Sequence, residues 1–299
     1  MPNSPTGLHR KAFIAQSSSP GTVIERFTNA AATQGKNANQ ARALTSSYKA
    51  SFMIESGPVN SFNLDELHSY SVGKPMLAAN LKLLDIYSKV TTCEQGCTGI
   101  ENKPKEGIIG RSFYCPSDVA NVTILLVSKN PGKADPRENS IYAPLDGAGR
   151  VAAHTQFVHD CFAGINTLVT SQYHARIVRW VSKILDVEAT PEAVFAHTAM
   201  TALVKCQSCG DKTDRLSDEA VGTCADKYLF SEIETIRPRF LLALGGEAYN
   251  YLMLPAVRAR HGLPVGKLYH PSWSNMRGGE ARYIDEELSK LRKQYQDAL

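Results

Sequence analysis

The sequence lacks any apolar run long enough to cross a membrane. No stretch approaches eighteen uninterrupted apolar residues, and no apolar core of a signal peptide follows Arg10 and Lys11. The glycine-rich G-x-G-x-x-G and Walker-type loops are also missing, which disfavours a nucleotide-binding α/β protein of unrelated function. We therefore expect an intracellular protein with no membrane partner.

The sequence also lacks a strong charge imbalance and an even set of cysteines. The formal net charge is +4 over 299 residues, a mildly basic balance that permits a phosphate-binding face but does not require one. The seven cysteines are an odd number. In a reducing compartment this count argues against a disulfide framework and leaves ligation of a metal or cluster open.

The composition changes at about residue 75. Residues 1–75 are rich in Ser, Asn, Thr, Ala and Gln and have weak apolar periodicity, which predicts a partly disordered N-terminal extension. Residues 76–299 have the patterns of one folded domain. Short apolar runs predict strands at 122–127, 194–198, 240–244 and 265–269. Helical spacing predicts helices before Cys93, at 149–167, at 172–185, at 218–236, near 248–252 and at 280–296.

These strands alternate with helices along the chain. The order predicts an α/β fold, a three-layer α/β/α sandwich with a central four-stranded parallel sheet. Ligands of such folds bind at the carboxyl ends of the strands. Two polar turns follow strands directly: Ser128-Lys-Asn-Pro-Gly132 after the first and His270-Pro-Ser272 after the fourth. We expect the ligand site to lie between these turns.

Three stretches together resemble the iron–sulfur, family 4-like branch of the uracil-DNA glycosylase superfamily. The turn at 128–132 is similar to the superfamily's first motif, G-x-x-P-G or G-x-N-P-G. The second stretch begins with a lysine–cysteine pair at 205–206 and continues through Arg215 and Cys224 to Ile-Arg-Pro at 236–238. The third is Tyr-His-Pro-Ser at 269–272. The resemblance covers about residues 88–290, and the order and spacing of the motifs carry it.

The resemblance implies a DNA-repair hydrolase that cleaves the N-glycosidic bond of uracil or a related base in DNA. Such an enzyme takes the base out of the stack, because the bond is otherwise out of reach. Asn130 aligns with the residue that positions water, which an amide can orient but not strongly deprotonate. His270 aligns with the donor that stabilises charge on the departing base. The alternatives are a helix cap or turn for Asn130 and an ordinary loop for His270.

The resemblance also implies a base pocket and a DNA-contacting loop. The segment 143–149, Ala-Pro-Leu-Asp-Gly-Ala-Gly, resembles the family's pocket loop. The expected pocket residues are Lys129, Pro131, Gly132, Tyr142, Leu145 and Ala202. The expected DNA contacts, by phosphate binding or by insertion into the duplex, are Ser272, Trp273, Met276 and Arg277. Ordinary packing is the alternative for Trp273 and Met276. Scattered basic residues in predicted loops, including Arg137, Arg150 and Lys205, are further candidates for a DNA groove.

Three residues depart from the family's pattern. Ala202 stands where an asparagine reads the base edge, Leu145 where an aromatic ring stacks on the base, and Lys129 where the residue is commonly acidic. Losing the reader should cost roughly 1–3 kcal/mol of base discrimination. Candidate substitutes are Tyr142 for the ring and Thr201 or His197 for the reader. The departures keep a second hypothesis open, a catalytically weak relative that binds DNA or a modified base without releasing it.

The resemblance assigns four cysteines, Cys93, Cys97, Cys206 and Cys224, to a structural [4Fe–4S] cluster. The first pair has three intervening residues where the family usually has two. Cys209 competes as a ligand through its C-x-x-C spacing with Cys206, zinc is the alternative metal, and separate buried thiols are the third interpretation. We expect a monomer bound to damaged or uracil-containing DNA, cytoplasmic and associated with the nucleoid.

Overall fold

The computed structural model describes residues 74–166, 168, 172–210, 215–272 and 279–299. They belong to one compact unit, Ser71–Leu299. The N-terminal extension predicted for residues 1–75 lies almost wholly outside the described residues and stays a prediction. No helix in these described ranges has the length and apolarity to cross a membrane.

A four-stranded sheet in the order β3-β2-β5-β6 forms the centre of this unit. Its strands are β2 (Ile124–Ser128), β3 (Thr198–Ala202), β5 (Phe240–Leu244) and β6 (Val265–Leu268). All three pairings are parallel, so the carboxyl ends of the strands meet at one edge. The predicted α/β sandwich with a four-stranded parallel sheet is confirmed.

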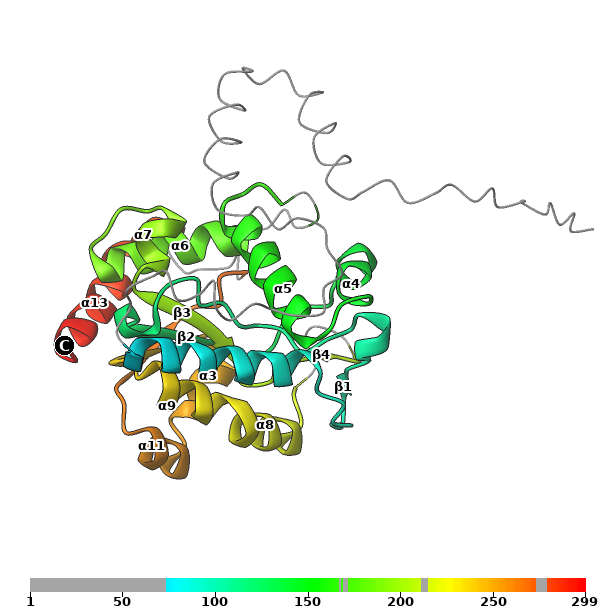
Figure 1. Cartoon of the computed structure of the whole chain (residues 1–299). Coiled ribbons are helices and arrows are strands. Elements are labelled where there is room, and N and C mark those ends of the chain that lie inside the picture. Colours follow the sequence, from blue (N-terminus) through cyan, green and yellow to red (C-terminus); the bar gives the residue numbers. More distant parts are fainter. Residues whose placement is uncertain (1–73, 167, 169–171, 211–214, 273–278) are drawn as a thin grey trace, which may run out of the picture. The chain divides into compact units, whose positions relative to one another are not determined.

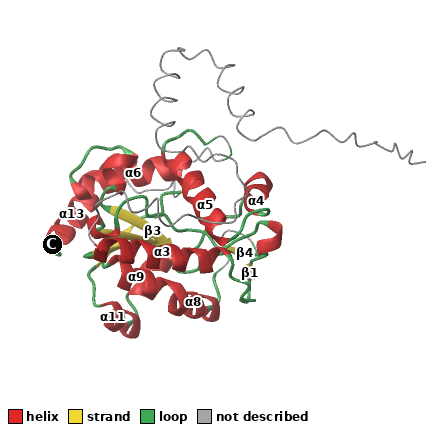
Figure 2. Cartoon of the chain, viewed as in Figure 1, coloured by secondary structure: helices red, strands yellow, loops and turns green. Residues whose placement is uncertain are grey.

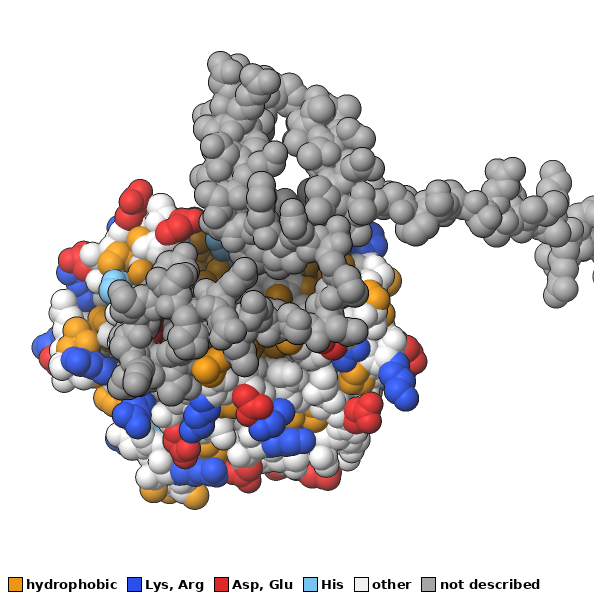
Figure 3. Space-filling view, in the orientation of Figure 1, with side chains coloured by type: hydrophobic (Ala, Val, Ile, Leu, Met, Phe, Trp, Pro, Cys, Tyr) orange, Lys and Arg blue, Asp and Glu red, His pale blue; other side chains and the backbone are white. Residues whose placement is uncertain are grey.

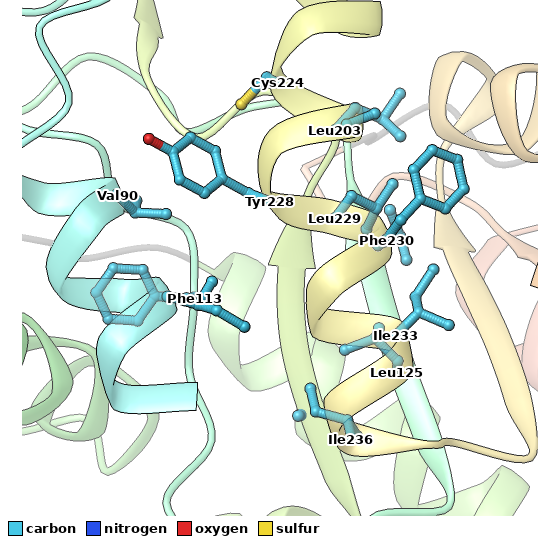
Figure 4. Close-up of a cluster of buried hydrophobic side chains, with 14 of the residues drawn as sticks. Val90, Phe113, Leu125, Leu203, Cys224, Tyr228, Leu229, Phe230, Ile233 and Ile236 are labelled. Carbon is cyan, nitrogen blue, oxygen red and sulfur yellow. The ribbon is translucent and has the colours of Figure 1, made fainter. Parts of the chain in front are cut away.

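Helices cover both faces of the sheet, as Figures 1 and 2 show. Alternate side chains of β2 enter two separate cores, with Leu125 and Val127 in one and Ile124 and Leu126 in the other. The first core is closed by α3 (Lys74–Thr91), α8 (Asp218–Cys224) and α9 (Phe230–Ile236), and Figure 4 shows part of it. The second is closed by α6 (Gln172–Leu185) and α13 (Ser289–Gln296). Burial on both faces explains why β5 is apolar along its whole length and β2 is apolar up to Ser128 at its end.

The remaining elements connect these layers. They are β1 (Ile100–Glu101), η2 (Pro104–Glu106), η3 (Val119–Asn121), α4 (Pro136–Tyr142), α5 (Gly147–Phe162), α7 (Pro191–Phe195), β4 (Gln207–Ser208), η4 (Ala225–Leu229), α10 (Gly246–Leu252), α11 (Pro255–His261), α12 (Gly279–Tyr283) and η5 (Ile284–Leu288). The π-helical turns η4 and η5 join α8 to α9 and α12 to α13. The helices predicted at 218–236 and 280–296 are therefore present, each with one such turn.

The strand predicted at 194–198 is wrong in position, because β3 begins only at Thr198. Val194 and Phe195 instead complete α7. Pro191 starts this helix, and the Thr190 side chain accepts a hydrogen bond from the Ala193 N–H at 3.3 Å. The capped start of α7 thus outweighs the β propensity of Val194 and Phe195.

Candidate active site

A cavity of about 1110 Å³ lies at the carboxyl ends of the strands. Its walls include the turn after β2, the ends of β3 and β5, the turn after β6 and one face of α5. The structure brings six of the predicted site residues together here: Lys129, Asn130, Pro131, Gly132, His270 and Ser272. Trp273, Met276 and Arg277 lie outside the described residues, so their assignment to DNA contacts stays a prediction.

The turn after β2 is held against the segment that follows β3. The Leu203 N–H donates to the Ser128 carbonyl at 2.9 Å, and the Val204 N–H donates to the Lys129 carbonyl at 3.1 Å. The Asn130 side chain continues this contact, with Nδ2 3.3 Å from Ser208 Oγ and 3.5 Å from the Cys206 carbonyl. Both contacts use the Nδ2 group as donor, so the Oδ1 atom of Asn130 is the side-chain atom that remains to accept a hydrogen bond.

Arg111 secures the other end of the same turn. Its guanidinium donates to the Gly132 carbonyl and, at 3.3 Å, to Gln207 Oε1. Gln207 Oε1 also accepts from the Ala134 N–H at 2.9 Å. The loop is therefore fixed by side chains from two separate segments. The sequence analysis did not single out Arg111 or Gln207, since neither belongs to a recognisable motif.

His270 is positioned as a neutral hydrogen-bond donor. Its Nδ1 lies 3.3 Å from the Ser272 N–H, which donates to it, so the proton of the neutral ring is on Nε2. The side chain of His270 is exposed to the cavity, but partial desolvation by the surrounding protein lowers its pKa, and the charge of Lys129 lowers it further, against the opposite effect of Glu247. Lys129 and Glu247 form an ion pair at 2.9 Å beside the imidazole. The ring thus keeps one proton, on the nitrogen that is available to a ligand.

Three of the predicted pocket residues do not line the cavity: Tyr142, Leu145 and Ala202. Tyr142 is fully buried, and its hydroxyl donates to Glu138 Oε1 at 3.3 Å, so its ring cannot stack on a base from this position. Ala202 is fully buried at the end of β3. Of the candidate substitutes, Thr201 lines the cavity, whereas His197 precedes β3 at the opposite edge of the sheet.

Lys205 is not a surface residue, which corrects the suggestion that it lines a DNA groove. Its side chain is 1% exposed, and Nζ lies 2.5 Å from Oε2 of the fully buried Glu232. Nζ also donates to the Thr201 hydroxyl and, at 3.0 Å, to the Ala202 carbonyl. The lysine therefore ties α9 to the end of β3, directly behind the cavity wall.

Arg150 is buried as well and donates to three backbone carbonyls, those of Tyr142, Thr91 and Pro104. Arg137, by contrast, is exposed and pairs with Asp135 at 2.9 Å. On the face drawn in Figure 3, Lys and Arg side chains are interspersed with Asp and Glu. The sequence could not separate buried from exposed basic residues, because the burial depends on helix and loop packing.

One wall of the cavity was missed by the sequence analysis. It is formed by α5, which presents His154, Phe157, Val158 and Cys161 to the cavity. Their spacing of three, one and three residues places them on one helical face. A histidine on an otherwise apolar helix face is the signal that was available in the sequence.

A second, small cavity is lined by four cysteines, Cys93, Cys97, Cys206 and Cys224. Burial raises the pKa of Cys206, and the charges of the other three sulfurs raise it further. The Lys205 N–H donates to Cys224 Sγ at 3.3 Å. Figure 4 shows Cys224 one turn of helix from Tyr228, which also lines this cavity. Cys209 is exposed and is not among the lining residues.

Cysteines from three segments of the chain line this cavity: the segment after α3, the loop after β3 and the end of α8. Thiolates packed together repel one another, and bound iron or zinc would relieve that repulsion. Within the described residues, however, no group of three or more His, Cys, Asp or Glu side chains is arranged to hold a metal ion.

Two comparisons with known proteins bear on these cavities. A family model described as "Uracil DNA glycosylase superfamily" matches residues 116–294, which is more than half of the chain. The matched range includes the turns after β2 and β6, and it begins after Cys93 and Cys97. No curated protein matches the chain.

Proposed function

The chain belongs to the uracil DNA glycosylase superfamily, and from this premise we propose that it hydrolyses the N-glycosidic bond of uracil or a related base in DNA. Membership implies a glycosylase-like hydrolase that acts on DNA. The finer proposal rests on one observation: Asn130 and His270 line the same cavity, from two different strand ends. Water positioning and stabilisation of the leaving base require groups on two sides of one bond.

Asn130 is proposed to orient the attacking water. Its Nδ2 is engaged with Ser208 and Cys206, so Oδ1 can accept a hydrogen bond from a water and direct the water's lone pair at the sugar carbon. An amide is too weakly basic to take the water's proton, which passes to solvent or to the departed base anion once the water has added to the sugar carbon. The bond to the base therefore breaks largely before the water adds, and the base departs as an anion.

His270 is proposed to stabilise that anion. The Nε2–H of a neutral imidazole donates to the oxygen on which the negative charge develops. The lowered pKa of His270 supports this role, since a neutral ring can donate without first transferring its proton. The Ser272 N–H fixes the tautomer.

The test is release of base from a uracil-containing oligonucleotide, with alkali cleavage of the abasic product. His270→Ala should lower the single-turnover rate about 10²–10³-fold, as for a lost oxyanion donor. Asn130→Ala should lower the rate while DNA affinity is kept. Gln156→Ala is the matched control, because Gln156 is exposed on α5 and absent from the cavity wall. Folded wild-type protein that releases no base from any deaminated oligonucleotide would contradict the proposal.

A second candidate function is a weak relative that binds DNA or a modified base without cleavage. The observation that favours it is the burial of Ala202 behind the cavity wall, so the residue aligned with the family's base reader does not reach the cavity. The oligonucleotide assay separates the two, because only the first releases base. If base is released, Ala202→Asn should raise activity on uracil in a drifted uracil glycosylase and lower activity if the pocket serves a bulkier base.

We further propose that the cavity lined by Cys93, Cys97, Cys206 and Cys224 holds a structural [4Fe–4S] cluster. When bound, the cluster would link the segment after α3, the loop after β3 and the end of α8 through four thiolate bonds. It would take no part in hydrolysis. The convergence of four sulfurs on one cavity supports this assignment, and zinc in the same cavity is the alternative that metal analysis decides.

A further inference from the structure

Two side chains of α5, His154 and Phe157, lie in the wall of the cavity and are candidates to recognise a base. His154 is 2% exposed and lines the cavity. Phe157 follows three residues later, on the same helix face, and is half-buried in the same wall. In this chain the residues aligned with a base reader and a stacking ring, Ala202 and Leu145, do not reach the cavity.

His154 is held from behind by a chain of polar groups. Its Nδ1 lies 3.3 Å from the Tyr142 hydroxyl, which lies 3.3 Å from Glu138 Oε1. Glu138 in turn is paired with Arg111 at 3.0 Å. The Glu138 carboxylate is a stronger hydrogen-bond acceptor than the imidazole Nδ1 of His154, so the Tyr142 hydroxyl donates its proton to Glu138. The phenol oxygen then accepts from the Nδ1–H of His154.

This arrangement leaves Nε2 of His154 as a hydrogen-bond acceptor. Burial, together with the charge of Arg111, lowers the pKa of His154 to about 3 against a smaller opposite effect of the Phe113 backbone, so the ring is neutral. Nε2 is buried and has no hydrogen-bond partner among the described residues. His154 lines the cavity and Nε2 is its ring nitrogen without a partner, so a ligand that enters the cavity is the group from which Nε2 could accept a hydrogen bond.

Phe157 offers a surface for stacking. Its ring is partly exposed in the cavity wall, and among the described residues no other aromatic ring packs on it. Aromatic rings bind extruded bases by stacking without regard to base identity. A stacking ring one turn from an edge acceptor is the geometry that a flipped base needs.

We propose that Phe157 and His154 form the base-recognition pair of this protein, and that His154 Nε2 selects bases with a ring N–H. Deamination creates such a group: cytosine N3 and adenine N1 are acceptors, whereas uracil N3 and hypoxanthine N1 carry a proton. An acceptor on the protein therefore binds the deaminated base and leaves the parent base unpaired. This inference rests on the proposed glycosylase function for its substrate class.

The test is an NMR titration of the full chain with two free bases, uracil and N3-methyluracil. Methylation removes the N–H and little else. Wild-type protein should bind uracil roughly 5- to 150-fold more tightly than N3-methyluracil, the range for one buried acceptor left unpaired. Uracil, but not N3-methyluracil, should also shift the Nε2 nitrogen resonance of His154.

Variants identify the residue responsible. His154→Phe should bind the two bases equally, and His154→Gln, whose amide oxygen can accept, should restore part of the preference for uracil. Phe157→Ala should weaken both bases roughly 5- to 150-fold and leave their ratio unchanged, while Gln156→Ala should change neither. Thermal melts check the fold. If His154→Phe does not fold, the wild-type ratio and His154→Gln still decide.

The inference is overturned if wild-type protein binds both bases equally, binds neither, or if His154→Phe retains the wild-type ratio. The titration needs no bond cleavage, so its failure is distinguishable from failure of the proposed function. Selective binding of uracil without release of base would support the recognition pair and refute the proposed glycosylase activity. Release of uracil without selective binding would do the reverse.

Discussion

Replacing Lys205 with methionine should destabilise the protein far more than loss of a surface charge. The ammonium lies 2.5 Å from Glu232 Oε2, and both side chains are buried. Removing one partner leaves an uncompensated buried carboxylate, which costs roughly 3–5 kcal/mol. Domains of this kind have total stabilities of about 5–15 kcal/mol. The Lys205→Met variant should therefore retain only part of the wild-type free energy of unfolding.

The sign of the pH dependence gives an independent check. Burial raises the pKa of Glu232, and Lys205 lowers it against that effect, so the lysine's removal should raise this pKa further. A carboxyl group with a raised pKa in the folded state binds its proton more tightly there than in the unfolded chain. Its contribution to stability is present at low pH and is lost as the pH rises through the folded-state pKa. Lys205→Met should thus be less destabilised at pH 5 than at pH 7.

Urea unfolding followed by circular dichroism measures both effects. The double variant Lys205→Met/Glu232→Leu removes the orphaned charge and should be more stable than the single variant. Lys183→Met, at an exposed position of α6, is the control and should stay within about 0.5 kcal/mol of wild type. A single variant within about 1 kcal/mol of wild type would refute the reasoning. So would a stable double variant that has lost DNA binding, because Lys205 would then act as a DNA contact.

Three further outcomes follow from the two cavities. Anaerobically purified protein should contain about four irons per chain, and Cys206→Ala should lose iron and stability; stoichiometric zinc without iron would contradict the cluster. DNA affinity should fall steeply as salt rises if phosphate contacts carry it, whereas an unchanged affinity would argue against them. Base release should persist below pH 6.5, the ordinary histidine pKa, because partial desolvation and Lys129 lower the pKa of His270. Lys129→Met should move the acid limb of the pH–rate profile to higher pH, and an unmoved limb would refute that assignment.

The sequence predicted the centre of the sheet and the two turns of the cavity well, because their signals are local. The apolar runs that form β5 and the first four residues of β2 can be read without knowledge of packing, and so can the polar turns after β2 and β6. The start of β3 could not be read in this way. Val194 and Phe195 are as apolar as a strand requires, and only the capped start of α7 decides their conformation.

Side chains that reach the cavity from elsewhere left weaker signals. Whether His154 and Phe157 face the cavity depends on the rotation of α5 about its axis. Arg111 reaches the site from a loop with no motif. Lys205 was misjudged as surface because a lysine next to a cysteine in a loop is usually exposed. Its burial depends on Glu232, which lies 27 residues further along the chain.

The segment after β3 serves both cavities at once. Residues 203–208 contribute Cys206 to the small cavity, while their backbone and Ser208 hold Ser128, Lys129 and Asn130. The cysteine-lined cavity and the turn after β2 are therefore not expected to be exchangeable between relatives as independent modules. A one-residue insertion between positions 203 and 208 would change the register of both cavities, so grafts should carry this segment and the turn after β2 together.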